Sequence, residues 1–410
     1  MEASFCCNML MRFLYIISLF HLMHSSPSRQ LCHENERSAL LQFKESFIIN
    51  KSVSFYDPIA NHRVESWTLE GEKSDCCSWD GVDCDEDTGH VIGLNLTNNC
   101  LYDSINSNST LFHLVHLQSL NLAYNNFNYS QIPSEVGNLL KLTYLNLSSS
   151  MFSGQIPFEI SKLSQLSSLD LCCNYDYDLP SGKYLLQFKE LGLTSLVRNL
   201  TRIEYLDLSG VNIFSTVPNI FANFSTLRSL YLHDCGMHGE FPKGIFKLPN
   251  LLVLDIKYNE VLTGSWPDFQ NWSSPLEDMT LAGTSFSGEL PASMGNLGLL
   301  ITLDIYVELQ HLRAHSLFTR NWNALKLDDE DHLTYIQAEI SYRVGSFNAF
   351  YWYSYSMKIT NKGLDMVYYK VQQSFRAIDM SSNKFVGEIP ESIGDLKGLH
   401  MLNISNNILT

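Results

Sequence analysis

The chain has 410 residues, a formal net charge of −16, and 45% hydrophobic against 17% charged residues. This length fits either two to four ordinary domains or one elongated repeat array. The negative charge and the lack of a dense Lys/Arg block argue against nucleic acids and anionic membrane surfaces as partners. The apolar content is sufficient for a large core, so the chain is expected to fold.

An apolar stretch near the N-terminus predicts a secretory signal peptide over residues 1–26. Residues 13–20 (FLYIISLF) follow Arg12 and precede small and polar residues around residues 25–28. The stretch is too short for a stable membrane anchor, and no later segment approaches 18 uninterrupted apolar residues. The sequence therefore predicts no transmembrane helix and no membrane contact for the chain as given.

Nine Asn-x-Ser/Thr sequons are consistent with transit through the glycosylating compartments. They lie at Asn50, Asn95, Asn108, Asn128, Asn146, Asn199, Asn223, Asn271 and Asn403.

Four cysteines that precede the periodic part of the chain predict a disulfide-stapled cap over residues 27–90. In an oxidising compartment they form two disulfides by default, and no Cys-x-x-Cys pair indicates zinc. Adjacent cysteines strain a mutual bond, so we favour Cys32 with Cys76 and Cys77 with Cys84. The sequence leaves the pairing of four others open: Cys100, Cys172, Cys173 and Cys235.

A repeat of 24 to 26 residues organises most of the chain. The unit is Leu-x-x-Leu-x-Leu-x-x-Asn-x-Leu-x-Gly-x-Ile-Pro. The landmark positions equivalent to its Asn are Asn99, Asn125, Ser150, Asn174, Val211, Cys235, Asn259, Thr284, Asn383 and Asn407.

Each part of the unit has a physical interpretation. Leu-x-Leu alternates side chains across a strand, so the leucines point inward and stacked repeats form a parallel sheet. The landmark Asn can bond backbone groups of adjacent coils in a buried turn, and Cys235 fits that position with fewer hydrogen bonds. One coil cannot bury its own leucines, so stability comes from neighbouring coils and capped ends.

The period breaks in two places. The step from Asn174 to Val211 is 37 residues, and the step from Glu308, where a landmark is due, to Asn383 is 75. Loops that interrupt a rigid scaffold are preferred sites for binding. We therefore divide the periodic region into repeats at 91–305, an insertion at 306–374, and an incomplete set of repeats at 375–410.

Three features together resemble plant extracellular leucine-rich-repeat proteins. The first is the cap motif CHENERSALLQFK at residues 32–44 with DCCSWDGVDC at 75–84. The second is the Gly-x-Ile-Pro variant of the repeat. The third is the insertion ending YSMKITNKG at 355–363, followed by AIDMSSN at 377–383, which looks like the island domain of plant receptor-like proteins.

The resemblance implies a fold and a function. The fold is an α/β leucine-rich-repeat solenoid of the plant type, with a parallel sheet on its concave face, a disulfide-stapled N-terminal cap and an island insertion. Family members are cell-surface immune or developmental receptors without a kinase, which recognise protein or peptide ligands and signal through partner receptor kinases. The implied location is the plasma-membrane surface, or the apoplast if the chain is soluble.

Residues that flank the strand leucines are expected to line a ligand-binding concave face. Tyrosine combines an apolar ring with a polar tip, as residues at interaction hot spots do. The set is Tyr144, Tyr205, Tyr231, His233, Asp234, Asp255, Lys257, Tyr258, Asp278, Thr280 and Tyr306. A competing interpretation treats the recurring aspartates only as solvated strand residues: Asp170, Asp207, Asp255, Asp304 and Asp379.

The island is rich in aromatic residues. It could present a recognition surface to a ligand or a partner kinase, or its aromatic residues could serve only to pack it on the solenoid. The candidate residues are Tyr342, Phe350, Tyr351, Trp352, Tyr353, Tyr355 and Lys358.

No motif for catalysis, a cofactor or a metal stands out. Residues 328–331 (DDED) are expected to form a solvated turn rather than a metal site. His311 and His315 have helical spacing but lack a His-Glu-x-x-His frame, and nucleophile elbows, phosphate loops and kinase signatures are missing. The sequence predicts a binding protein, not an enzyme.

Two departures from the family pattern keep other functions open. Few repeats precede the island, and the chain ends at Thr410 inside a repeat, which indicates a truncated gene product or a soluble form. The alternatives are a secreted inhibitor of microbial cell-wall hydrolases, like polygalacturonase-inhibiting proteins, and a nonfunctional receptor fragment.

Overall fold

A computed structural model of the chain describes residues 31–49, 63–69, 74–176, 183–188, 192–270 and 274–305. Further along it describes residues 312–313, 337–344, 347–354, 357–361, 364–368, 376–383, 385–389, 393–394 and 396–409. For strands at 312–313 and 337–368 the description covers the backbone alone. The predicted signal peptide and the sequons Asn50 and Asn271 lie outside the described residues.

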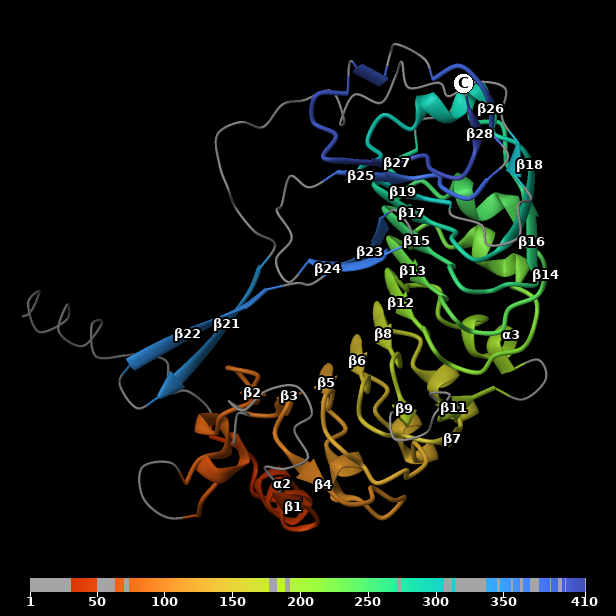
Figure 1. Ribbon diagram of the computed structural model, residues 1–410. Helices are drawn as coiled ribbons and strands as arrows, with labels where there is room; N and C mark the ends of the chain where they lie inside the picture. Colours follow the sequence, from red (N-terminus) through yellow and green to blue (C-terminus); the bar gives the residue numbers. More distant parts are fainter. Residues whose placement is uncertain are drawn as a thin grey trace, which may run out of the picture.

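One sheet of twelve strands runs through the molecule and forms the concave side of an arc (Figure 1). Its first pair, β2 and β3, is antiparallel, and every later pair is parallel and in register. In order, the strands are β2 (Val82–Cys84), β3 (Val91–Asn95), β5 (Ser119–Asn121), β6 (Tyr144–Asn146), β8 (Ser168–Asp170), β12 (Tyr205–Asp207), β13 (Ser229–Tyr231), β15 (Val253–Asp255), β17 (Asp278–Thr280), β19 (Thr302–Asp304), β25 (Ala377–Asp379) and β27 (Met401–Asn403). The predicted leucine-rich-repeat solenoid is confirmed.

The convex side carries short strands and helical turns. The strands come from the Gly-x-Ile-Pro elements and pair in parallel as β7 (Gly154–Gln155) with β11 (Leu186–Gln187), β14 (Gly239–Glu240) with β16 (Leu262–Ser265), β18 (Ser285–Glu289) and β20 (Leu312–Arg313), and β26 (Val386–Gly387) with β28 (Ile408–Leu409). The 3-10 turns are η5 (Thr110–His113), η6 (Ser134–Asn138), η7 (Phe158–Lys162), η8 (Asn219–Asn223), η9 (Lys243–Lys247) and η10 (Ala292–Asn296), and one α-helix, α3 (Gly192–Val197), takes the same place. A proline directly precedes all of these 3-10 turns except η5, because proline lacks the N–H needed to continue a strand and fixes φ for a helical start.

The core lies between the two sides as a stack of apolar side chains. The central strand residue is at most 1% exposed in every repeat from Leu94 to Ile378. The landmark residues from Asn99 to Asn383 are similarly buried, from Asn99 and Ser150 at 0% to Asn125 at 5%, whereas Asn407 in the last described coil is half-buried. This burial explains why the period is so regular, since each coil covers the leucines of its neighbour.

The landmark asparagines form a ladder along the inside of the turns. The Nδ2 atom of Asn259 donates to the carbonyls of Leu232 and Ile256, each at 2.8 Å. Its Oδ1 accepts the N–H groups of Cys235 and Met237, at 3.2 and 2.8 Å. One amide thus satisfies backbone groups of its own coil and of the preceding coil.

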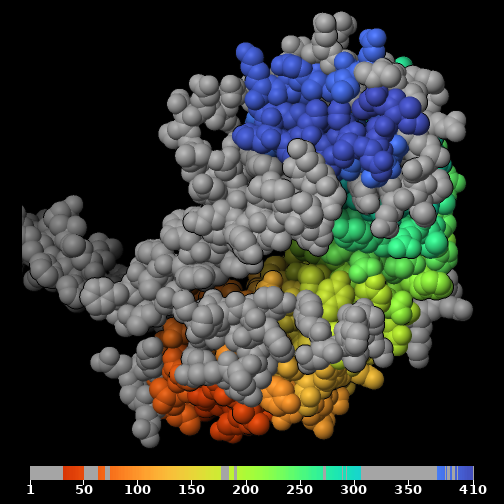
Figure 2. Space-filling view, in the orientation of Figure 1, coloured from red at the N-terminus to blue at the C-terminus, as the bar shows by residue number. Residues whose placement is uncertain are grey.

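The N-terminal cap consists of α2 (Glu34–Glu45), β1 (Ile48–Ile49), η2 (Arg63–Ser66) and η4 (Cys76–Ser78), with β1 paired to β4 (Leu101–Tyr102) of the first repeat. Helix α2 has Glu34 and Glu36 in its first turn and Lys44 in its last, which suits the helix dipole. Disulfides join Cys32 to Cys76 and Cys77 to Cys84, the pairing favoured from the sequence. The cap and the last repeats lie at opposite ends of the array (Figure 2).

The two breaks in the period leave the main sheet uninterrupted. Residues after the Asn174 landmark form an antiparallel pair, β9 (Tyr175–Asp176) and β10 (Lys183–Tyr184), before the chain returns to the convex side at β11. After β19 the chain leaves for the island and re-enters at β25, which pairs directly with β19. Residues 312–313, inside the segment expected for the island, still pair with β18 as in an ordinary repeat.

Within the island two hairpins are described. They are β21 (Gln337–Val344) with β22 (Phe347–Ser354), and β23 (Met357–Asn361) with β24 (Leu364–Tyr368). Figure 1 draws both on the open, concave side of the arc. The domain boundaries expected from the sequence remain predictions.

Candidate functional site: the concave face

The parallel register aligns equivalent residues in rows across the concave face. The row from the third strand position contains Asn95, Asn121, Asn146, Asp170, Asp207, Tyr231, Asp255, Thr280, Asp304, Asp379 and Asn403. Most members are Asp or Asn, and neighbours in the row lie one strand spacing apart, about 4.8 Å.

The recurring aspartates have a structural role that the sequence did not reveal. Asp207 accepts the N–H of Ser209 at 2.9 Å, and Asp255 and Asp379 make the same bond two residues on. These three side chains belong to residues only 8 to 9% exposed. For these three residues the interpretation as solvated strand residues is wrong, because each buried carboxylate closes a turn at the end of its strand. Asp170 and Asp304 are half-buried.

Two of these carboxylates have raised pKa values. Asp170 and Asp207 are direct partners on β8 and β12. Burial raises the pKa of Asp207 to about 7, with the nearby charge of Asp170 as the second cause. Burial also raises the pKa of Asp170. Removal from water and like charge both favour the neutral acid here.

Tyrosines cover the middle of the face beside these acids. The rings of Tyr205 and Tyr231 are 5.6 Å apart, and the Tyr205 hydroxyl lies 3.4 Å from Asp207 Oδ2. The pKa of Tyr231 is raised to about 12, first by burial and second by the charge of Asp207. Tyr144, two strands before β12, is also half-buried, and its hydroxyl accepts a hydrogen bond from Asn146.

A second cluster of side chains lies at the ends of β13 and β15 and combines charged groups with an exposed aromatic ring. Lys257 Nζ is 3.1 Å from Asp255 Oδ2, and His233 Nδ1 is 3.9 Å from the same oxygen. Tyr258 is 57% exposed and meets the His233 ring edge-on. Burial lowers the pKa of His233. Burial is also the largest single effect on Lys257 and lowers its pKa, but the charge and the hydrogen bond of Asp255, together with the charge of Asp304, outweigh it, so the pKa of Lys257 is raised.

The first period break places two further tyrosines at the rim of this face. Tyr184 donates a hydrogen bond to Asp234 Oδ1, and the Tyr129 hydroxyl lies 3.1 Å from Asp176. Tyr175 packs over Gly210, where a Cβ atom would come within 1.9 Å of its hydroxyl oxygen. The β9–β10 pair is therefore held from both sides. The sequence predicted the break in the period, but it did not predict the contacts of these tyrosine side chains.

The other residues that we expected to bind a ligand lie partly on the concave face and partly outside the described residues. Asp278 and Thr280 are half-buried on β17, beyond the Lys257 group. Tyr306 and Tyr355 lie outside the described residues, as do the side chains of the other island candidates: Tyr342, Phe350, Tyr351, Trp352, Tyr353 and Lys358. The structure brings Tyr205, Tyr231, His233, Asp255, Lys257 and Tyr258 together on three adjacent strands.

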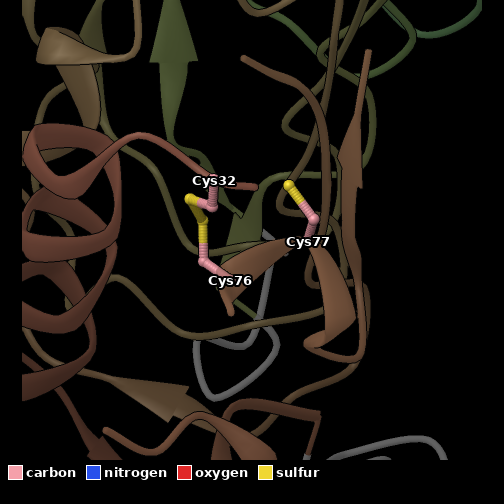
Figure 3. A group of neighbouring side chains, drawn as sticks. All are labelled: Cys32, Cys76 and Cys77. Carbon is pink, nitrogen blue, oxygen red and sulfur yellow. A yellow bond between two sulfur atoms is a disulfide. The ribbon is translucent and has the colours of Figure 1, made fainter. Parts of the chain in front are cut away.

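The cap cysteines are engaged in disulfides. Figure 3 shows Cys77 beside the Cys32–Cys76 disulfide, and Cys77 is bonded to Cys84. These sulfurs are close together but are not available as thiolate metal ligands. Of the cysteines left open by the sequence, Cys172, Cys173 and Cys235 are thiols, and Cys100 is buried.

Comparisons with known proteins give the family. The profile of the leucine rich repeat N-terminal domain matches residues 33–85, and the leucine rich repeat profile matches residues 116–139, 141–163 and 374–396. Receptor-like protein 6 of Arabidopsis thaliana is 40% identical over 71% of this chain, and receptor-like protein Cf-9 of Solanum pimpinellifolium is 36% identical over 71%. The chain belongs to the plant leucine-rich-repeat receptor-like proteins.

The chain of this receptor-like protein spans 29% of the first of these relatives and 33% of the second. Among solved structures, the plant peptide hormone receptor RGFR1 in complex with RGF2 superimposes with a TM-score of 0.51 at 23% identity, over 75% of this chain and 38% of that one. A plant ice-binding protein superimposes with a TM-score of 0.51 at 23% identity, over 73% and 93% of the two chains. These likenesses show the fold alone, and the site must carry the argument about function.

No helix in the part of the chain that the structure describes is long and apolar enough to cross a membrane.

Proposed function

We propose that this chain is the extracellular ligand-recognition region of a receptor-like protein, and that it binds a peptide or protein on the concave face around β12, β13 and β15. The observation that carries the proposal is the cluster of Tyr205, Tyr231, His233, Lys257 and Tyr258 on a rigid sheet. Partly exposed aromatic rings beside satisfied charges are typical of binding hot spots. A peptide ligand is also supported by the solved complex of the plant peptide hormone receptor RGFR1 with RGF2, which has a similar fold.

Binding, rather than catalysis, is the function this face supports. Its carboxylates accept backbone N–H groups at 2.9 to 3.1 Å, so they are committed to the turns. The rings of Tyr205 and Tyr231 and the Lys257 ammonium are the groups left to contact a ligand. A ligand for this surface would offer apolar side chains to the tyrosines and an acceptor to Lys257.

A phage library of random-sequence peptides, panned on the secreted chain, tests this proposal. We expect enriched peptides whose affinity falls at least tenfold, about 1.4 kcal/mol or more, in Tyr231→Ala and in Lys257→Ala. Phe158→Ala is the matched control, because Phe158 is 59% exposed on η7 of the convex side. Enriched peptides that bind the concave variants as well as they bind the original chain would overturn the assignment.

We further propose that the island and the repeats that follow it dock a partner receptor kinase in defence or developmental signalling. The aromatic composition of the island and its position between β19 and β25 support this proposal. Tyr351→Ala combined with Trp352→Ala should weaken co-immunoprecipitation with receptor-kinase ectodomains while leaving secretion unchanged. Unchanged recruitment by a normally secreted variant would count against this docking site.

A further inference from the structure

A cluster of three histidines and a glutamate lies where the cap meets the first repeats. The rings of His33, His90 and His116 stack on one another, with centroid distances of 3.9 and 3.7 Å and interplanar angles of 12° and 13°. His33 precedes α2, His90 directly precedes β3, and His116 lies three residues before β5. Glu36, in the first turn of α2, completes the cluster.

Glu36 is a buried carboxylate with few charged neighbours. It is 3% exposed, and its Oε2 atom accepts the N–H of Val91 at 2.9 Å. Its Oε1 atom lies 3.2 Å from His90 Nδ1, and among the described residues it has no ion pair with Lys or Arg. A buried carboxylate favours a nearby positive charge.

The hydrogen bonds show which ring nitrogens can face an ion. Lys141 Nζ can only donate, so His116 Nδ1, 2.9 Å away, carries a lone pair. His90 Nδ1 lies 3.2 Å from Glu36 Oε1. A neutral imidazole can carry its proton on Nε2, so an ion can take the place of the proton between these two atoms.

The distances suit a single ion. One ligand atom each from Glu36, His90 and His116 lies within 4.8 Å of the others. Zinc bonds of 2.0 to 2.1 Å in a tetrahedron place neighbouring ligand atoms about 3.3 Å apart. The 3.2 Å between Glu36 Oε1 and His90 Nδ1 already matches. Half-buried His116 is stacked on His90, so its ring has to turn for its in-plane lone pair to point at the same ion.

We propose that Glu36, His90 and His116 form a binding site for a divalent transition-metal ion such as Zn²⁺, which links the cap to the first repeat. Two imidazoles and a carboxylate select zinc or copper over calcium or magnesium. The ion displaces the Lys141 ammonium, which lies on an exposed side chain and can withdraw. The site is separate from the proposed peptide-binding face and does not depend on it.

Calorimetric titration of ZnCl₂ into the full secreted chain, without a polyhistidine tag, tests the site. We expect one equivalent of zinc to bind, a higher melting temperature with zinc, and reversal of both by EDTA. His116→Ala should weaken binding at least tenfold and remove the shift in melting temperature. The matched control is His113→Ala, because His113 is an exposed histidine at the end of η5, three residues before His116.

Lys141→Met gives a second and opposite readout. It removes the competing ammonium, so it should tighten zinc binding while changing no ligand. Equal zinc affinity in the original chain and in His116→Ala, or no binding up to about 1 mM zinc, would overturn the proposal. Unchanged or weaker binding in Lys141→Met would also contradict it, and this test holds even if His116→Ala fails to fold.

Discussion

At the scale of single residues, Asp and Asn at the third strand position accept the same backbone hydrogen bond but differ in charge. Asn146 accepts the N–H of Ser148 at 2.9 Å, as Asp207 accepts that of Ser209. The turn therefore needs an acceptor oxygen, not a charge. Where two aspartates are adjacent, as at Asp170 and Asp207, the charge carries a cost in stability.

Asp207→Asn is expected to stabilise the chain at high pH. The native pKa of about 7 lies above the ordinary value of 3.8, so the native state binds this proton more tightly than the unfolded chain does. The stability that Asp207 contributes is complete below about pH 4 and is lost as the pH rises through about 7, by at most about 4 kcal/mol. Melting temperatures from pH 5 to 8 should show a gain for Asp207→Asn that grows with pH.

Asp255→Asn is the matched control for this prediction. Asp255 occupies the equivalent position but has an ion pair with Lys257 at 3.1 Å. Replacing Asp255 with Asn removes that ion pair and should bring no gain in melting temperature at pH 8. A gain of equal size in both variants would refute the explanation by repulsion between Asp170 and Asp207.

Burial divides the sequons into those suited to a glycan and those that are not. Asn95, Asn108, Asn128, Asn199 and Asn223 are exposed. Asn403 is 6% exposed, and its Nδ2 donates to Asp379 Oδ2 at 3.0 Å. Peptide mapping after deglycosylation should find the exposed sites modified and Asn403 unmodified, and a fully occupied Asn403 would contradict the packing of β27 on β25.

At the scale of the element, the landmark amide of a repeat makes several hydrogen bonds to backbone groups at once. The five hydrogen bonds of the Asn259 side chain join backbone groups from two coils at a position that is 1% exposed. Cys235 occupies the equivalent position in the preceding coil, where its Sγ lies near the carbonyls of Leu208 and His233. A thiol is tolerated there because it is small and still donates weakly.

Asn259→Ala should destabilise the array by about 2–4 kcal/mol, because it leaves buried N–H and C=O groups without partners. Denaturant unfolding of the secreted chain measures this loss. Asn250→Ala is the control, since Asn250 is exposed and makes one bond to the Ser225 carbonyl at 2.7 Å. A loss no larger than that of the control would show that the ladder is not the main constraint on the turn.

At the scale of the whole molecule, the array is a one-dimensional stack whose first coil is covered by the cap. The cap contributes α2, and Phe43 and Leu40 of that helix belong to the same apolar cluster as the repeats. Two disulfides then tie the ends of the cap together. Loss of the cap would expose the leucines of the first coil.

The two disulfides should differ in how much they stabilise the folded chain. Cys32 and Cys76 are 44 residues apart, whereas Cys77 and Cys84 are 7 apart. On the chain-entropy model these separations correspond to about 4 and about 2.4 kcal/mol. Replacing both cysteines of the longer pair with serine should lower the melting temperature more than replacing the shorter pair, and the reverse order would contradict an entropic origin.

The sequence by itself determined the repeat, the cap and the family. The leucines, the landmark asparagines and the Gly-x-Ile-Pro elements act within one coil or between adjacent coils, so their spacing is enough to predict a parallel sheet and its inward side chains. The cysteine pairing followed from the same local reasoning. The set of positions expected to bind a ligand stays a prediction.

Only the tertiary structure decided which of those positions meet. Asp170 and Asp207 are 37 residues apart in sequence because the first period break intervenes, yet they are direct neighbours in the sheet. His33, His90 and His116 belong to the cap, a turn and a repeat, and they stack only because stacking of the coils aligns equivalent turns at one edge. Sequence spacing records contacts within a coil, whereas charge repulsion and metal geometry depend on distances between coils, which the fold sets.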